Sequence, residues 1–168
     1  TGLSVAIFAM VGLKAQIVSW RRGARCSVGA VRNLFGGMTE ALGNNVAGHL
    51  LLSTIAQPRC EGVIRRLNAE AADARKFPVA ELTALVAEAR DSGVAHGGMG
   101  FGSQARCFAA LLPADACDQP LAVGFVFGPE DNVNPEALEA SLGEAIRQVL
   151  GQDELAPASI EQLQIAAA

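Results

Sequence analysis

Two apolar runs in the second half of the chain constrain its fold more than any other feature. They cover Cys107–Leu112 and Leu121–Phe127, and the connection between them carries Asp115, Asp118 and Pro120. Apolar runs separated by a polar connection predict two antiparallel strands joined by a longer loop. Neither run alternates apolar with polar residues, which is typical of strands covered on both faces. We therefore expect a central pair of strands with helices on each side.

The beginning of the chain predicts another hairpin. Ser4–Met10 and Ala15–Trp20 are rich in apolar and β-branched residues, and a short turn separates them. A further strand, or a loop, is expected over Ser27–Phe35, ending at the pair Gly36-Gly37. The N-terminal part of the chain is thus expected to supply two or three strands of the sheet.

A first helix is predicted after this region. Asn44 or Asn45 is placed to cap a helix that runs through Leu51, and Pro58 is expected to stop the segment. Gly48 lies inside this helix, where a glycine costs about 1 kcal/mol of helix stability relative to alanine. We therefore expect another backbone or a ligand to approach the helix at Gly48.

Three later segments have apolar residues at helical spacing, and a strand is expected near Val94. The helical segments are Val63–Leu67, Pro78–Gly93 and Asn134–Gly151. Strands at both ends of the chain with helices between them are typical of an antiparallel sheet covered by helices. The predicted fold class is therefore α+β, with helices on both faces of the sheet.

Composition indicates one folded domain and argues against several function classes. A chain of 168 residues, of which 51% are hydrophobic, can bury a substantial core. The net charge of −4 provides no basic face for nucleic acid within this chain. The apolar runs are too short for a membrane span, and no basic segment precedes the first of them as in a signal peptide. No membrane partner is expected.

Metal and nucleotide sites are not expected either. The four cysteines and two histidines lack the close spacing of zinc ligands, so reduced thiols of a cytoplasmic protein are the simpler interpretation. The glycine-rich stretch from Gly97 to Gly102 resembles a phosphate loop, but a G-x-G-x-x-G pattern starting at Gly98 would need a glycine at Ser103. We interpret the stretch as a mobile loop that borders a cavity, and we expect no cofactor.

An enzyme is the alternative that the cysteines leave open. Cys107 could be a nucleophile with His49 or His96 as its base. Neither histidine belongs to a recognisable catalytic motif, and Cys107 lies inside an apolar run. A buried structural thiol is the expected role, and no catalytic residue is predicted.

Several stretches together resemble the effector-binding domain of the IclR (isocitrate lyase regulator) family of bacterial transcription regulators. They are Thr1–Val5, Ala47–His49, Arg90–Ala95, Arg106–Ala110 and Leu121–Pro129. The resemblance covers residues 1–151 as one effector-binding domain and leaves 152–168 as a C-terminal tail. It implies a GAF/PAS-like fold and assembly into dimers or tetramers. It also implies DNA binding only through an N-terminal winged helix-turn-helix domain that is absent from this chain.

The resemblance also implies a pocket for a small organic acid or an aromatic effector, between the sheet and the loop before the first helix. Carried over by position, its residues are Arg32, Val46, Ala47, Gly98, Cys107, Phe125 and Phe127. Backbone amides of the first helix would bind the acid, and Cys107 would lie at the pocket floor. Two phenylalanines replace serines of the family pattern, and Gly97 or Gly98 replaces an acidic residue. Aromatic walls favour a ring-bearing effector, and the alternative is a filled pocket in a structural oligomerisation module.

Overall fold

The computed structural model describes residues 2–25 and 28–150, which form one sheet with helices on both of its faces. Neighbouring strands are all antiparallel, and their order is β3-β2-β1-β6-β5-β4. The strands are β1 Ser4–Val11, β2 Lys14–Arg21, β3 Thr39–Ala41, β4 Val94–Gly98, β5 Arg106–Leu111 and β6 Leu121–Phe127. This arrangement confirms the predicted α+β class.

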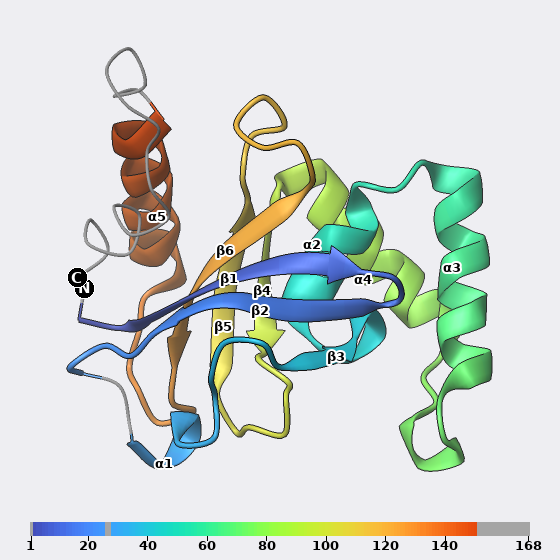
Figure 1. Cartoon of the computed structure of the whole chain (residues 1–168), viewed down its shortest axis with the longest axis horizontal. Helices are drawn as coiled ribbons and strands as arrows, with labels where there is room; N and C mark the ends of the chain where they lie inside the picture. Colours follow the sequence, from blue (N-terminus) through green and yellow to red (C-terminus); the bar gives the residue numbers. More distant parts are fainter. Residues whose placement is uncertain (1, 26–27, 151–168) are drawn as a thin grey trace.

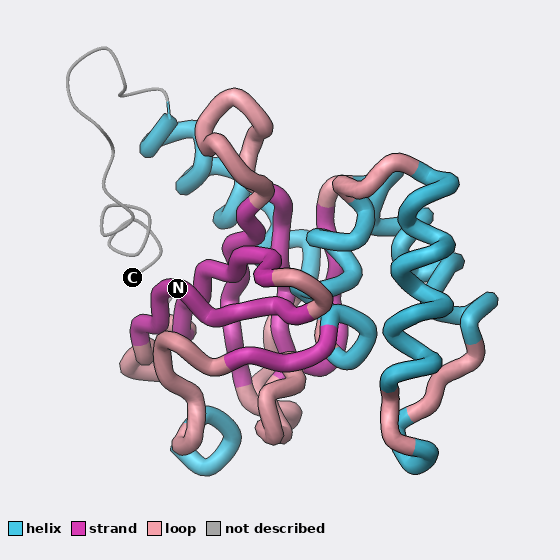
Figure 2. Tube along the Cα trace, turned by 45° about the vertical axis from the view of Figure 1, so that its right-hand side comes forward, coloured by secondary structure: helices cyan, strands magenta, loops and turns pink. Residues whose placement is uncertain are grey.

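The helices divide between the two faces of the sheet. In Figure 1, α5 stands on one side of the strands, and α2, α3 and α4 lie on the other. The helices are α1 Val28–Val31, α2 Val46–Ser53, α3 Gln57–Glu70, α4 Val79–Ser92 and α5 Pro135–Leu150, with 3-10 turns η1 Leu42–Asn44 and η2 Asp73–Arg75. The trace in Figure 2 shows the same separation of α5 from the other helices. None of the described helices is both long enough and apolar enough to span a membrane.

Two hydrophobic clusters form the core, one on each face. On the α2 face, Phe8, Cys107 and Val126 of the sheet pack with residues of α2, α3 and α4. On the α5 face, the sheet contributes mainly Val5, Ile7, Phe108, Val123, Phe125 and Phe127, which pack against Leu138, Leu142 and Ile146 of α5. Successive residues of a strand point to opposite faces, so β1, β5 and β6 each supply side chains to both clusters.

The position of α2 is fixed at both of its ends. At the N-terminal end, the side-chain oxygen of Asn45 accepts a hydrogen bond of 2.7 Å from the amide of Gly48. At the C-terminal end, the guanidinium of Arg90 donates to the carbonyl oxygens of Ser53 (2.9 Å) and Ile55 (3.0 Å). A Cβ at Gly48 would overlap the carbonyl oxygen of Leu42. The expected close approach of a backbone to Gly48 is therefore confirmed.

Most predicted elements are present. Both hairpins and the strand at Val94 are confirmed, as are the cap at Asn45 and the end of α4 at Gly93, which has a left-handed φ of 73°. Asn134 begins α5, because its side chain accepts a hydrogen bond from the amide of Glu136 at 2.9 Å. Gly151, expected to end this helix, lies outside the described residues.

Two expectations about the first half of the chain are wrong. The described part of 27–35 contains the short helix α1 and no strand, because its buried residues Ala30, Val31 and Leu34 follow a helical spacing instead of alternation. The next strand is β3, after the glycine pair. Pro58 does not stop α2, which ends at Ser53; it lies in the first turn of α3. Proline suits that turn because the amide it lacks has no partner there.

Candidate functional site

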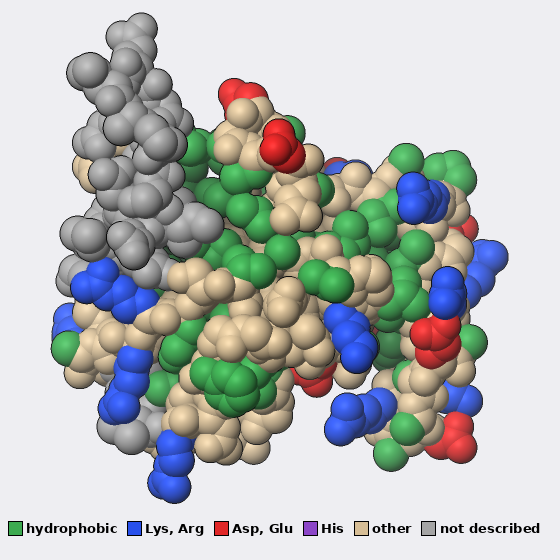
Figure 3. Space-filling view, in the orientation of Figure 1, with side chains coloured by type: hydrophobic (Ala, Val, Ile, Leu, Met, Phe, Trp, Pro, Cys, Tyr) green, Lys and Arg blue, Asp and Glu red, His purple; other side chains and the backbone are tan. Residues whose placement is uncertain are grey.

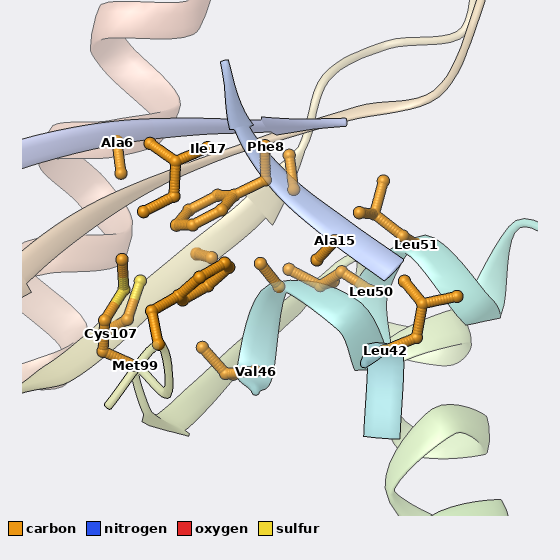
Figure 4. Close-up of a cluster of buried hydrophobic side chains, with 14 of the residues drawn as sticks. Ala6, Phe8, Ala15, Ile17, Leu42, Val46, Leu50, Leu51, Met99 and Cys107 are labelled. Atoms are coloured by element: carbon orange, nitrogen blue, oxygen red, sulfur yellow. The ribbon is translucent and has the colours of Figure 1, made fainter. Parts of the chain in front are cut away.

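The candidate site lies between the sheet and the N-terminal end of α2. We call it the α2-side cluster and define it by Phe8 of β1, Val46 of α2, Met99 and Phe101 of the β4–β5 loop, and Cys107 of β5. Each of these residues is buried. Figure 4 shows the side chains of Phe8, Val46, Met99 and Cys107 converging on the space between the strands and α2. This is the place where the resemblance puts an effector.

The first turn of α2 supplies the polar groups nearest to this cluster. The amides of Val46 and Ala47 have no acceptor within the helix, because the first amides of an α-helix have no preceding turn to bond to. Val46 and Ala47 are 2% and 1% exposed. Two buried amides at the positive end of a helix dipole can bind a carboxylate.

The β4–β5 loop fills the space beside these amides. Gly100, Phe101 and Gly102 have φ angles of 75°, 55° and 68°, so three successive residues adopt left-handed backbone conformations. This conformation places the side chains of Met99 and Phe101 inside the protein, where they are 1% and 5% exposed. The ring of Phe101 stacks on that of Phe8, with 6.1 Å between the ring centroids. Two side chains of the loop are thus part of the core on the α2 face, whereas the sequence predicted a loop that borders a cavity.

The loop is attached directly to the residues that precede α2. The carboxylate of Glu40 accepts a hydrogen bond from the amide of Phe101. A Cβ at Gly100 would lie 2.6 Å from Oε2 of Glu40 and 2.8 Å from Cβ of Asn45, so only glycine fits there. The amide of Met99 donates to the carbonyl of Ala105 at 2.9 Å, which closes the base of the loop. A displacement of the loop backbone at Phe101 must therefore break its bond to Glu40.

The structure does not bring all seven predicted site residues together. Val46, Ala47 and Cys107 lie on the α2 face of the sheet, as expected. Phe125 and Phe127 lie on the opposite face and pack against α5. The prediction that they line one pocket with Val46 is wrong, because odd and even positions of β6 point to opposite faces.

The β6 positions on the α2 face are Ala122, Gly124 and Val126. Val126 is directly opposite Cys107, and a Cβ at Gly124 would lie 2.7 Å from the sulfur of Cys107. A one-residue change of register exchanges the two faces of a strand, and this accounts for the error. The sequence alone does not give the register of a hairpin with a long loop.

The two remaining residues also lie away from the cluster. Gly98 is exposed at the end of β4, and Gly97 is the glycine that faces α2, since a Cβ on it would lie 3.9 Å from that of Val46. Arg32 is exposed just after α1. Sequence reasoning did not identify Met99 and Phe101. The available signal was two large apolar residues alternating with glycines, a pattern with no role in a solvent-exposed loop.

Electrostatics at the site favour neutral side chains. Complete burial raises the pKa of the Cys107 thiol far above its usual range, so the thiol is protonated at neutral pH. Desolvation lowers the pKa of His49, although its ring nitrogen contacts the carbonyl oxygen of Gly43 at 3.3 Å. His96 pairs with Phe108 across β4 and β5, which places it on the α5 face. A protonated thiol is a poor nucleophile, so these groups fit packing better than catalysis.

Within residues 2–25 and 28–150, no group of three or more His, Cys, Asp or Glu side chains could hold a metal ion. The polar groups beside the α2-side cluster are the backbone amides of Val46 and Ala47 and the carboxylate of Glu40, which is bonded to the Phe101 amide. The amides of α2 can bind an anion or a carbonyl oxygen.

The chain is similar to known proteins in its three-dimensional structure. No protein-family model and no curated protein sequence matches the chain. The effector domain of a protein described as the transcriptional regulator IclR from Acinetobacter sp. ADP1 has a TM-score of 0.64 and 17% identity over 99% of this chain and 86% of its own. A protein described as a transcriptional regulator from Rhodococcus sp. RHA1 has a TM-score of 0.67 and 17% identity, over 99% of this chain and 63% of its own.

A third solved structure is the repressor BlcR from Agobacterium tumefaciens, with a TM-score of 0.63 and 16% identity over 87% of this chain and 56% of its own. This chain spans most of the isolated effector domain and less than two thirds of the two longer proteins. The fold is that of IclR-type effector domains, and the fold predicted from the resemblance is confirmed. Identities of this size establish the fold alone.

Proposed function

We propose that this chain is the ligand-sensing and oligomerising domain of a bacterial transcription regulator, and that its effector binds at the α2-side cluster. The shared fold supports a regulatory domain. The observation that carries the site is the position of Phe101, a ring inserted by a loop beside two amides that have no acceptor within α2. An effector that replaced this ring would meet both an apolar wall and an anion-binding helix end.

The chemistry of the cluster favours an aromatic or apolar organic acid. The acid group would accept hydrogen bonds from the amides of Val46 and Ala47. The apolar part would take the place of the Phe101 ring against Phe8, where aromatic stacking contributes about 0.5–1.5 kcal/mol beyond buried area. A small polar acid such as pyruvate fits less well, because buried polar groups left unpaired cost about 1–3 kcal/mol each.

Sensing would follow from the attachment of the loop. Because the backbone amide of Phe101 is bonded to Glu40, an effector that expels the ring by displacing the loop would also release Glu40, in the segment that precedes α2. The protein would then have two states, with the loop inside or outside, and the effector would bind only the second. A difference in affinity between two states is what shifts their populations. The arrangement of subunits, and with it DNA binding by an attached helix-turn-helix domain, would follow that shift.

The first experiment is a thermal denaturation series with phenylacetate, benzoate and pyruvate, on the natural chain and on the Phe101→Ala variant. A ligand that binds only the folded protein raises the melting temperature. We expect the aromatic acids to raise it, and to raise it more in the variant, because the ring no longer has to be expelled. Phenylacetamide, which lacks the charge, should raise it less.

A filled, structural oligomerisation module is the second candidate, and the burial of Met99 and Phe101 specifically favours it. In that case none of these compounds changes the melting temperature of either protein. Sedimentation velocity would then show the same oligomer for the natural chain with and without the aromatic acids. This outcome would remove the effector from the proposal and leave the assembly role.

The regulatory half of the proposal needs the complete gene product. We expect it to bind DNA near its own gene, as a cytoplasmic dimer or tetramer, with an affinity that changes when the aromatic acid is added. Fluorescence anisotropy of labelled promoter DNA measures this directly. A gene product that binds no such DNA contradicts a role in transcription, whatever the sensor domain binds.

A further inference from the structure

A pocket lies where the β1–β2 hairpin meets the C-terminal end of α3. We call it the hairpin pocket and define it by Leu13, Lys14, Asn44, Leu67, Arg75 and Phe77. Its volume of about 410 Å³ lies in the range of about 300–1,000 Å³ that is usual for small-molecule sites. Figure 3 shows the surface hollowed between the hairpin and α3, with basic side chains on both sides.

The walls of the hairpin pocket are apolar and fixed in place. Leu67 is 5% exposed, and Leu13 and Phe77 pack against the core on the α2 face. The amide of Phe77 donates to the side-chain oxygen of Asn68 at 3.0 Å. A Cβ at Gly43 would lie 2.9 Å from the Phe77 ring, so the ring fits in this position because residue 43 has no side chain. An apolar ligand would therefore meet a rigid surface.

The rim of the pocket carries two cations that have no carboxylate partner. Lys14 and Arg75 are exposed, and neither forms an ion pair or a side-chain hydrogen bond within the described part of the chain. Glu70 also lines the pocket, but its carboxylate is held by Arg66 at 2.7 Å. Two unpaired positive charges at the mouth of an apolar pocket suit a ligand with one negative group.

We propose that the hairpin pocket binds an organic monoanion with an apolar body. Its acid group lies between Lys14 and Arg75, and its hydrocarbon part lies against Leu67 and Phe77. The amide side chain of Asn44 supplies a further polar contact at the pocket edge. Charge-assisted hydrogen bonds from both cations fix the acid group, and they are about twice as strong as neutral ones.

This site is distinct from the α2-side cluster, although the two are neighbours. Ala41 and Asn44 line the hairpin pocket, and the adjacent residues Glu40 and Asn45 support the β4–β5 loop. The proposal does not rest on the sensing function. Phe101→Ala changes the α2-side cluster alone, so we expect it to leave binding at the hairpin pocket unchanged.

Amide NMR titration of the 168-residue chain with octanoate, and with uncharged octanamide, tests the proposal. We expect octanoate to shift the amides of Leu13, Asn44, Leu67 and Phe77, and octanamide to bind at least about tenfold more weakly. Octanoate shifts centred on Val46 and Phe101 instead would place the anion in the α2-side cluster and overturn the proposal.

The double variant Lys14→Gln/Arg75→Gln should weaken octanoate binding by about tenfold or more. Arg59→Gln/Arg65→Gln is the matched control. It removes the same charge from exposed positions of α3 that do not line the pocket, and binding should change by less than about twofold. Equal weakening in both double variants would show a general charge effect and would also overturn the proposal.

Discussion

The two faces of the sheet bury aromatic rings in different ways. On the α5 face, the rings of Phe108, Phe125 and Phe127 come from the strands themselves. On the α2 face, Phe8 comes from a strand, but Phe101 comes from a loop with left-handed backbone conformations. A ring on a central strand cannot leave without breaking the sheet, whereas a ring on a loop can leave when the loop moves.

Small residues on the strands of the α2 face add to this difference between the two faces. On the α2 face the strands present the small residues Gly97, Ala109 and Gly124, and a Cβ at Gly124 would lie 2.7 Å from the sulfur of Cys107. Two large apolar side chains of this face, Met99 and Phe101, come from the β4–β5 loop. A face that is completed by side chains of a loop can exchange them for a ligand when the loop moves. A face that is filled by side chains of its own strands is permanently packed.

Phe125→Ala should be the most damaging substitution in this comparison. Phe125 is completely buried between β1 and β5, and removal of a buried phenylalanine ring costs about 3–5 kcal/mol. The free energy of unfolding, measured with urea, should fall by that amount. Indole or phenol should not restore it, because the space left by the ring lies between the sheet and α5, which would have to separate to admit the compound. Restoration by either compound would show that the α5 face also exchanges its contents.

Phe101→Ala should cost less, about 2–3 kcal/mol, because a loop can relax into part of the space that the ring leaves. The remaining space is apolar and enclosed, so small aromatic compounds should bind in it and raise the melting temperature. The same urea and thermal experiments serve both variants. A loss as large as that of Phe125→Ala, with no response to indole or phenol, would contradict the exchangeable role of Phe101.

The architecture was largely predictable from the sequence because its signals are local. Apolar runs with turns between them gave both hairpins, and Asn45, Gly93 and Asn134 act at helix ends through their own side chains or φ angles. The strand expected over 27–35 failed where the signal was ambiguous. A short apolar segment can bury residues with either period, and here Ala30, Val31 and Leu34 follow the helical one.

The site was less predictable because it depends on contacts distant in sequence. Cys107 and Val46 lie together on the α2 face, as the resemblance implies, but the phenylalanines of β6 lie on the opposite face. The pairing register across a nine-residue connection decides which side chains join Cys107. The position of Phe101 depends on Glu40, 61 residues earlier in the chain. No local pattern contains that information.

The stability of a glycine variant relative to the alanine variant should differ in sign between Phe101 on the α2 face and Phe125 on the α5 face. At Phe101, where φ is 55°, glycine adopts the left-handed conformation without strain, so Phe101→Gly should be about 1 kcal/mol more stable than Phe101→Ala. At Phe125, in the middle of β6, Phe125→Gly should be about 0.5–1 kcal/mol less stable than Phe125→Ala. Urea unfolding of the four variants measures both differences. The same ranking at both positions would mean that the Phe101 backbone is not held left-handed.

The smallest effect is a pH dependence that belongs to the α2 face. Desolvation lowers the pKa of His49 below its ordinary value of 6.5, and the contact with the Gly43 carbonyl only partly opposes it. The unfolded chain therefore takes up a proton at a higher pH than the folded protein does. The stability due to neutral His49 is complete above pH 6.5 and is lost as the pH falls toward the folded-state pKa. His49→Gln should remove this loss, measured as the difference in unfolding free energy between pH 7.5 and pH 5.5. His96→Gln on the α5 face is the control, and this variant should keep the loss of stability at the lower pH. An equal change in both variants would show that the pH dependence does not arise on the α2 face.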